Sequence, residues 1–374
     1  MTQIADIDFD SLDHIIKQKY TLNISNIRPM ETLSLEEYDT RKTCVAIGND
    51  LLRQGKMGVV ILAGGQGSRL GYDHAKGTYN IGINSNISIF QMHINRLLAF
   101  WKKEHIKIHC FIMTSSKNNK ETVNFFERNN FFGYDKNYIH FFIQGNIVTL
   151  DNSYNLMLSD EKTICYSPNG NGFWYKDLLS NGYEGLLRSN GIEWLEVVSV
   201  DNVLQNFIDP AFLGTIFYSS ASVGAKVVKK INAEEKIGTI CINNGHPDIL
   251  EYFEIPDNIK YEVNSSGELL YSYGVILNYV FKIQTLNQID FDKLPIHMAH
   301  KKVAYLSSNG IIQKPLKENA IKFEYLLTDL IACMDSCISF EVDRQHEFAP
   351  IKNLTGDDSV ETARELLLQN GFLI

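Results

Sequence analysis

Apolar residues in the first 55 positions of the chain repeat at helical spacing. One series follows Ser11 at Leu12, Ile15 and Ile16, and a second runs through Cys44, Ile47 and Leu51. The second series is preceded by Ser34-Leu-Glu-Glu37, which has the form of a capping box, and Gly55 is a suitable end signal. The pattern therefore predicts an N-terminal helical lobe over residues 1–55.

From residue 56 the pattern changes to short apolar runs that alternate with helical segments. This alternation is typical of a doubly wound α/β sheet, and we assign a central domain to residues 56–355. Closely spaced runs between residues 225 and 253 favour an antiparallel extension of the sheet, and a short C-terminal helix within 356–374 completes the chain. The predicted strands are 59–63, 108–113, 139–143, 194–200, 225–230, 237–242 and 249–253; the predicted helices are 88–101, 120–129 and 359–369.

Composition narrows the class of protein. The chain has 374 residues, of which 44% are hydrophobic and 21% charged, a globular balance. A net charge of −9 disfavours a nucleic-acid partner. The apolar run 59–63 is far too short to cross a membrane, and the acidic N-terminus lacks the features of a secretory signal. The six cysteines contain no C-x-x-C pair, so we expect reduced thiols and a cytoplasmic protein.

The strongest chemical signal is the glycine-rich loop Gly64-Gly-Gln-Gly-Ser-Arg69, which directly follows the strand 59–63. Glycines let backbone N–H groups approach phosphate oxygens, and an arginine adds a planar cationic fork. The spacing fits neither the dinucleotide fingerprint, because Leu70 stands where a third glycine is required, nor a Walker A loop, because Lys76 is not followed by Ser or Thr. A plain strand-to-helix turn is the alternative interpretation, and the clustered glycines and cations weaken it.

The complete pattern, L-x-G-G-x-G-[ST]-R-L-G followed by a lysine, resembles that of the eukaryotic UDP-N-acetylglucosamine pyrophosphorylases, which are UTP:sugar-1-phosphate uridylyltransferases. The resemblance extends in order over about residues 33–355. The other segments that carry it are Ser88–Gln91, Phe111–Ser115, Phe141–Gly145, Pro168–Gly172, Val200–Val203, Gly224–Val228, Glu251–Glu254, His297–Lys302, Ile321–Glu324 and Glu347–Asn353.

The resemblance implies a Rossmann-like fold of the nucleotide-diphospho-sugar transferase type and a specific reaction. UTP and N-acetylglucosamine 1-phosphate would give UDP-N-acetylglucosamine and pyrophosphate by in-line attack on the α-phosphate, with Mg²⁺ as cofactor. The nucleophile is already an anion, so catalysis needs positioning and charge neutralisation rather than a catalytic triad. The resemblance implies neither a nucleic-acid nor a membrane partner, and it leaves the oligomeric state open.

The same resemblance assigns roles to individual positions. Arg69, Lys76 and Lys352 would be the catalytic cations around the phosphates, with Lys322 completing the cluster. Asp201 would lie near the nucleotide and is the one carboxylate that we consider for Mg²⁺. The remaining substrate contacts would come from Leu62, Ala63, Gly64 and Gly65 for the nucleotide, Gln144, Gly170 and Asn171 for uracil and sugar, and Gly238, Glu251 and Asn278 for the sugar.

Several positions depart from the family pattern. Ala75 replaces a proline before Lys76, which predicts a looser loop. Leu326 and Thr328 replace two aromatic residues expected at the acetyl pocket, and Ser272–Val275 replaces Asn-Ala-Gly-Asn. The resemblance also leads us to expect a β-rich C-terminal domain, so we interpret the C-terminal region as truncated. A UDP-glucose or broad-specificity UDP-sugar pyrophosphorylase and a catalytically silent nucleotide-sugar sensor therefore stay open as alternatives.

Overall fold

A computed structural model describes residue 12, residue 16 and residues 26–374 of the chain. Backbone contacts divide it into two compact units, and each is described by itself. The smaller unit comprises Met1–Asn23, Gln144–Asp177 and Asp290–Leu330, and the larger comprises Ile24–Ile143, Leu178–Ile289 and Ile331–Ile374. The predicted helix that begins at Ser11 lies almost wholly outside the described residues. The division predicted at residues 55 and 355 stays a prediction.

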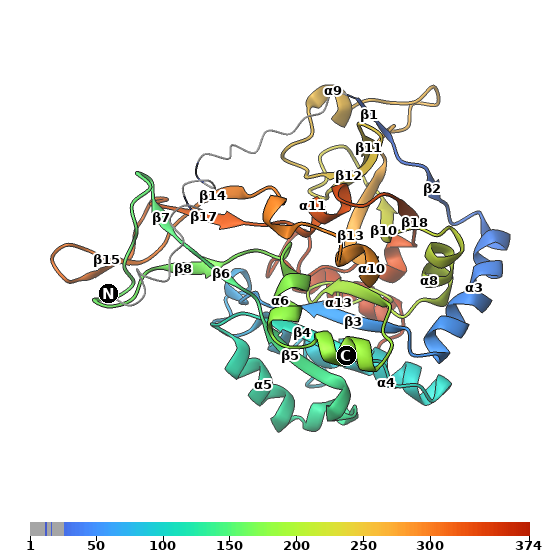
Figure 1. The fold of residues 1–374 in the computed structure, drawn as a ribbon, viewed down its shortest axis with the longest axis horizontal. Coiled ribbons are helices and arrows are strands. Elements are labelled where there is room, and N and C mark those ends of the chain that lie inside the picture. The colour runs from blue at the N-terminus through green and yellow to red at the C-terminus, as the bar shows by residue number, and fades with distance from the viewer. Residues whose placement is uncertain (1–11, 13–15, 17–25) are drawn as a thin grey trace. The chain divides into compact units, whose positions relative to one another are not determined.

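The larger unit is built on an 11-stranded mixed sheet, so the predicted mixed α/β class is confirmed. Its main path runs β2-β18-β10-β13-β9-β3-β4-β5, and β1, β11 and β12 extend it (Figure 1). The strands are β1 (Ile27–Pro29), β2 (Thr32–Leu33), β3 (Met57–Leu62), β4 (Cys110–Thr114), β5 (Ile139–Ile143), β9 (Trp194–Ser199), β10 (Val223–Lys229), β11 (Thr239–Asn243), β12 (His246–Leu250), β13 (Tyr273–Lys282) and β18 (Cys337–Glu341).

Strand β3 lies between β4 and β9 and is parallel to both. All six of its residues are buried, which explains why its sequence is a continuous apolar run rather than an alternating one. The antiparallel strand β13 pairs with β9 and β10, and β11 pairs with β12, so the predicted antiparallel extension is also present. The carboxyl ends of β3 and β9 thus meet at one edge of the sheet.

Several helices of the larger unit begin at a residue whose side chain caps the first turn. Ser88 accepts a hydrogen bond from the N–H of Gln91, Asp209 accepts from Ala211, and Ser359 forms a capping box with Thr362. The helices are α3 (Tyr38–Arg53), α4 (Ile89–Glu104), α5 (Asn119–Arg128), α7 (Glu184–Ser189), α8 (Pro210–Tyr218), α9 (Asp257–Lys260), α10 (Ile283–Leu286), α12 (Arg344–Glu347) and α13 (Val360–Gln369).

The N-terminal part of the larger unit differs from its predicted form. The short strands β1 and β2 were not predicted, and helix α3 begins at Tyr38, after the predicted capping box at residues 34–37. Half of that box is present, because the Ser34 N–H donates to the Glu37 carboxylate at 2.8 Å. The helix ends at Arg53, just before Gly55, which has φ = 67°.

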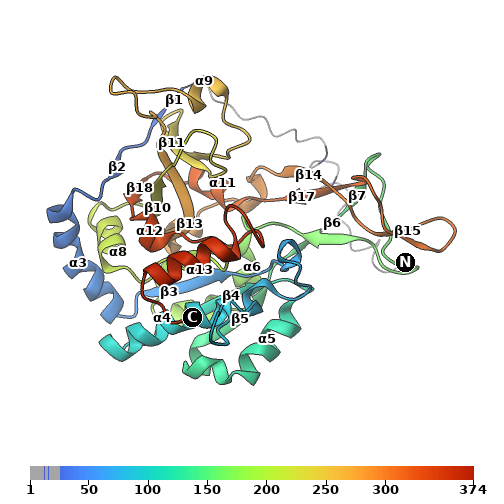
Figure 2. The same ribbon diagram turned by 180° about the vertical axis from the view of Figure 1, so that it is seen from behind.

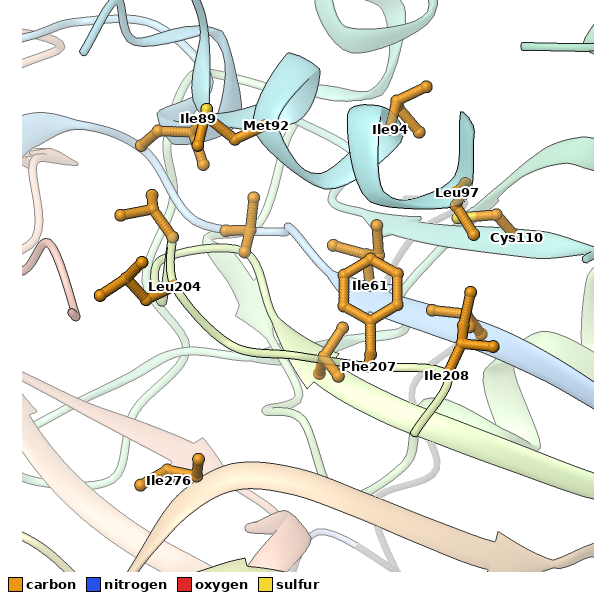
Figure 3. Close-up of a cluster of buried hydrophobic side chains, with 14 of the residues drawn as sticks. Ile61, Ile89, Met92, Ile94, Leu97, Cys110, Leu204, Phe207, Ile208 and Ile276 are labelled. Atoms are coloured by element: carbon orange, nitrogen blue, oxygen red, sulfur yellow. The ribbon is translucent and has the colours of Figure 1, made fainter. Parts of the chain in front are cut away.

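A large apolar core packs helix α4 against the central strands. Figure 3 shows Ile89, Met92 and Leu97 of α4 on one side of Ile61 of β3, with Phe207 from a loop close to Ile61. All five side chains are at most 3% exposed. Burial of this kind supplies most of the stabilisation of a helix in a protein, so α4 is fixed by its apolar face rather than by helix propensity.

Helices α3 and α8 lie side by side in both views of the ribbon (Figures 1 and 2). Their backbones come very close at two glycines. A Cβ atom on Gly48 would lie 1.9 Å from the Pro210 carbonyl oxygen, and one on Gly214 would lie 1.9 Å from that of Cys44. Any side chain at either position would therefore force the two helices apart.

The smaller unit consists of short strands around its own apolar cluster, which includes Leu150, Ile164, Ile296, Ile321 and Phe323. Two helices contain residues assigned to each of the two units: α6 (Trp174–Ser180) and α11 (Leu327–Ala332). The strands are β6 (Asn146–Val148) with β8 (Tyr166–Pro168), β14 (His297–Lys301) with β17 (Ala320–Glu324) and β7 (Leu150–Asp151), and β15 (Tyr305–Leu306) with β16 (Ile312–Gln313).

No helix among the described residues has both the length and the apolar character needed to cross a membrane.

Candidate active site

The glycine loop leaves the carboxyl end of β3 and folds back on itself before Lys76. The Gly67 N–H donates to the His74 carbonyl at 2.9 Å, and the Lys76 N–H donates to the Gly65 carbonyl at 3.2 Å. Gly67 must be glycine, because a Cβ atom there would lie 2.8 Å from the Tyr72 ring. Gly65 has no atom within 4 Å of its absent Cβ and is exposed, so its backbone is open to a ligand. Leu62 and Ala63 are buried.

Lys76 and Asp201 form an ion pair at the edge where β3 and β9 end. The Lys76 Nζ lies 3.0 Å from Asp201 Oδ2, and both side chains are mostly buried, with exposed fractions of 15% and 21%. Asp201 also accepts a hydrogen bond from the Ser199 hydroxyl. Burial alone would raise the pKa of Asp201, but Lys76, the Ser199 hydroxyl and Lys352 hold this pKa below its usual value. Asp201 is therefore a carboxylate within a cationic site.

Lys352 is brought to the same edge by a backbone connection. The Ile351 N–H donates to the Asp201 carbonyl at 2.9 Å, and the Val203 N–H donates to the Ala349 carbonyl at 3.2 Å. The Lys352 Nζ itself lies 2.8 Å from Asp358 Oδ2, and both side chains remain about one third exposed. Two backbone hydrogen bonds therefore join the loop 201–203 to the segment 349–352.

A cleft of about 1010 Å³ in the larger unit is lined by Arg69 and Lys352. Within the described part of the chain, the Arg69 guanidinium has no ion-pair partner, whereas Arg344, another lining residue, pairs with Glu235. The other lining residues are Ile231, Asn232, Glu234, Lys236, Ile237, Tyr252, Phe348, Ala349, Pro350, Asn353, Asp357, Asp358, Thr362 and Leu366. A cleft with exposed cations next to a glycine loop suits a phosphorylated ligand.

The predicted sugar contacts in the larger unit separate into two groups. Gly238 and Glu251 lie together, since a Cβ atom on Gly238 would be 3.7 Å from Glu251 Oε2, and they adjoin the cleft residues Ile237 and Tyr252. Asn278 is instead fully buried, and its amide donates to the Asn206 carbonyl at 3.2 Å. The structure therefore brings Gly238 and Glu251 next to residues that line the cleft, and the sugar contact assigned to Asn278 stays a prediction.

The remaining predicted residues belong to the smaller unit. Gly170 has φ = 93°, and a Cβ atom there would lie 2.3 Å from the Tyr325 carbonyl oxygen, so only glycine fits. The Asn171 side chain accepts a hydrogen bond from the Leu327 N–H at 2.9 Å, which gives it a structural task. Gln144 is buried, and Lys322 lies half-buried on β17. Their roles toward a nucleotide stay predictions.

A buried ionic cluster, which the sequence did not reveal, lies next to the loop 201–209. The fully buried Lys226 Nζ lies 3.0 Å from Asp209 Oδ2 and 2.8 Å from Glu347 Oε2, and it donates to the Asn206 carbonyl at 2.8 Å. Burial alone would lower the pKa of Lys226, but Asp209, Glu347 and Glu196 raise it above its usual value. We refer to Lys226, Asp209, Glu347 and Glu196 as the Lys226 cluster.

Glu196 completes the Lys226 cluster from strand β9. Its Oε2 accepts a hydrogen bond from the Ile208 N–H at 2.7 Å. Burial raises the pKa of Glu196 to about 7, although Lys226 lowers it. The cluster thus stabilises the loop 201–209, which carries Asp201, through hydrogen bonds to Asn206 and Ile208. Glu347 lies at the start of the segment that leads to Lys352.

Among residues 12, 16 and 26–374, no group of three or more His, Cys, Asp or Glu side chains is arranged to hold a metal ion. Asp201 is compatible with a more modest requirement, since Mg²⁺ usually keeps several waters and takes one or two carboxylates together with substrate phosphates.

Comparison with known proteins shows the family to which the chain belongs. The family described as UTP–glucose-1-phosphate uridylyltransferase matches residues 9–370. The UDP-N-acetylglucosamine pyrophosphorylase of Saccharomyces cerevisiae is 33% identical over 340 residues, which cover 87% of this chain and 71% of that protein. The UDP-N-acetylglucosamine diphosphorylase 2 of Arabidopsis thaliana is 31% identical over 396 residues, with 99% and 77% covered.

Solved structures agree as well. The UDP-N-acetylglucosamine pyrophosphorylase from Trypanosoma brucei has a TM-score of 0.85 at 25% identity and covers 98% of this chain and 77% of that chain. The chain belongs to the UTP–glucose-1-phosphate uridylyltransferase family, the family of the UDP-sugar pyrophosphorylases. It spans between 65% and 77% of the length of such curated relatives.

Proposed function

We propose that the chain transfers the uridylyl group of UTP to N-acetylglucosamine 1-phosphate and releases pyrophosphate. The observation that carries the proposal is the joining of Lys76, Asp201 and Lys352 at one edge of the sheet, next to the glycine loop and the cleft. The relatives named above support the choice of the amino sugar. The fold would correspondingly be of the nucleotide-diphospho-sugar transferase type, and the protein would act in the cytoplasm.

The chemistry would proceed as an in-line displacement. A phosphate oxygen of the sugar phosphate attacks the α-phosphorus of UTP, and the bond to the bridging oxygen of pyrophosphate breaks. Lys76, Lys352 and Arg69 would neutralise the charge that builds up on the phosphates, and a fixed cation stabilises such charge more effectively than water does. Family members generally use Mg²⁺, which would add charge neutralisation, with Asp201 as its carboxylate ligand.

The test is a substrate panel. Purified protein is incubated with UTP, Mg²⁺ and a series of sugar 1-phosphates, and the release of pyrophosphate is measured. We expect N-acetylglucosamine 1-phosphate to have the highest kcat/KM. No turnover with any member of the panel would contradict the enzyme proposal and favour a nucleotide-sugar sensor. One feature argues against a sensor, namely that all four expected cations are present: Arg69, Lys76, Lys322 and Lys352.

A UDP-glucose or broad-specificity pyrophosphorylase is the second candidate, and one observation favours it. Leu326 and Thr328 stand where the family resemblance leads us to expect aromatic residues at the acetyl pocket. A tenfold preference for glucose 1-phosphate would establish this alternative, and such a preference requires only about 1.4 kcal/mol at the transition state.

A further inference from the structure

Asn118, the residue directly before helix α5, is hydrogen-bonded to the start of the glycine loop. This side chain is fully buried, and its Oδ1 accepts hydrogen bonds from the N–H and the hydroxyl of Ser115, at 2.8 and 3.1 Å. The opposite end of the amide, Nδ2, therefore faces the loop and donates to the carbonyls of Ala63 and Gly65, at 3.0 and 3.3 Å.

The same helix holds the end of the loop through Glu121. Its Oε2 accepts a hydrogen bond from the Ala75 N–H at 3.1 Å, and its Oε1 lies 2.8 Å from His74 Nδ1. Asn118 and Glu121 are three residues apart, a spacing that places both on one face of the first helical turn. One turn of α5 thus contacts both ends of the segment 63–75.

Ala75 is the point at which this contact reaches Lys76. Its N–H is taken by Glu121, and its carbonyl accepts from the Thr78 N–H and the Thr78 hydroxyl, at 2.9 and 2.8 Å. Both backbone polar groups of Ala75 are therefore hydrogen-bonded immediately before Lys76, whose Nζ lies 3.0 Å from Asp201 Oδ2. Ala75 stands where the family resemblance leads us to expect proline, and the looser loop that we predicted for alanine is opposed by these bonds.

We propose that Glu121 is a positioning residue for Lys76: its hydrogen bond to the Ala75 N–H fixes the backbone from which Lys76 reaches the phosphates. The inference rests on the proposed function, because it requires Lys76 to contact the substrate. Glu121 acts on Lys76 through the backbone of Ala75, so its loss makes the position of the lysine less precise while the sugar pocket stays intact. A positional error of this kind lowers kcat more than it raises KM.

The backbone conformation of Ala75 allows a second substitution to restore the activity lost in Glu121→Ala. Such a rescue is not expected if Glu121 has only a general structural role. Ala75 has φ = −54°, which a proline ring can adopt. In the wild-type background, Ala75→Pro removes the N–H that donates a hydrogen bond to Glu121, and it places the proline ring against the Glu121 carboxylate. In a Glu121→Ala background, the same change restricts φ directly and no longer removes a hydrogen bond.

The experiment is a double-mutant cycle of Glu121→Ala and Ala75→Pro, with Glu127→Ala as control, because Glu127 is an exposed glutamate on the same helix. We expect Glu121→Ala to lower kcat about tenfold with little change in the KM for the sugar phosphate. The double variant should return to within about threefold of wild type, and Glu127→Ala should resemble wild type. Wild-type kcat in Glu121→Ala, or a double variant no faster than Glu121→Ala, overturns the proposal.

Amide hydrogen exchange separates this proposal from the proposed function. Exchange in the peptide covering residues 64–78 should be faster in Glu121→Ala and should slow again in the double variant, whether or not the protein turns over any sugar phosphate. If the exchange pattern holds and no substrate reacts, only the proposed function fails. If exchange in this peptide is the same in wild type and Glu121→Ala, the result contradicts the positioning role of Glu121 and leaves the proposed function untouched.

Discussion

Lys76 and Lys226 both pair with an aspartate in the segment that follows β9, but they do so in opposite surroundings. Lys76 and its partner Asp201 keep part of their side chains exposed next to the cleft, whereas Lys226 is fully buried between Asp209 and Glu347. A partly exposed lysine can exchange its carboxylate for a substrate phosphate. Lys226 cannot, because its side chain is fully buried and two mostly buried carboxylates depend on it for their charge balance. One ion pair is thus suited to binding and the other to support.

The largest effect that this comparison predicts is on stability. Lys226→Met should lower the free energy of unfolding by about 3–5 kcal/mol, because Asp209 and Glu347 lose their buried cation. Equilibrium unfolding in urea measures the loss. Lys226→Met combined with Glu347→Gln should regain part of it, since one uncompensated charge is removed. A loss below about 1 kcal/mol in the single variant would contradict a supporting role.

Lys76→Met should give the converse result. We expect kcat/KM to fall about 100-fold, or about 2.7 kcal/mol, because a cation that faces the reacting phosphates is lost. The free energy of unfolding should fall by less than in Lys226→Met, since Asp201 keeps the hydrogen bond from Ser199 and the nearby charge of Lys352. Steady-state kinetics and urea unfolding of the same preparation check both parts. Lys352→Ala should likewise lose turnover and keep the fold.

The buried region also predicts a dependence of stability on pH. Burial, together with Arg96, lowers the pKa of His93 to about 4, so the unfolded chain binds a proton more readily than the folded one below pH 6.5. Stability should therefore fall as the pH drops from about 7 toward 4, with His93 accounting for about 2 kcal/mol at pH 5. The unfolding free energy of His93→Gln should lose about this much of its pH dependence; an unchanged pH profile would refute the assignment.

The smallest predicted effect concerns the partner of Lys352. Under the proposed function, Asp358 would compete with a phosphate for this lysine, and the pair is about one third exposed. Asp358→Asn removes the competing charge but keeps the backbone carbonyl that accepts from the N–H groups of Lys352 and Asn353. We expect the KM for UTP to fall about fivefold, which corresponds to about 1 kcal/mol. A higher KM would mean instead that Asp358 orients Lys352.

Local patterns were sufficient to predict the central strands and the long helices α3, α4, α5 and α13, whereas α8 and the shorter helices were not predicted. The run 59–63 predicted β3 because a strand buried on both faces is apolar throughout, and Ser88 and Ser359 marked helix starts that the structure confirms. The strands β1 and β2 were missed since they contain three and two residues and are held by pairing with β11 and β18, which lie far along the chain.

The candidate site divides in the same way. The glycine loop and Lys76 could be recognised because they are contiguous in sequence, and the order of motifs pointed to Asp201 and Lys352. Lys226 was interpreted as part of a strand, since nothing local distinguishes a buried lysine from an exposed one. Its environment depends on Glu347, 121 positions away along the chain. The burial of Asn278 was missed for the same reason, because it is a tertiary property, and its assignment to the sugar stays a prediction.

The contact of α3 with α8 has a consequence beyond the two helices. Helix α8 begins at Pro210, directly after Asp209, so the distance between the helices also determines where the Asp209 carboxylate lies relative to Lys226. Because Gly48 and Gly214 have no side chains, the two helices lie close enough to hold the Asp209 carboxylate at its position in the interior. A single methyl group added at the buried Gly214 would therefore displace the Asp209 carboxylate and change the electrostatic field near the loop that carries Asp201.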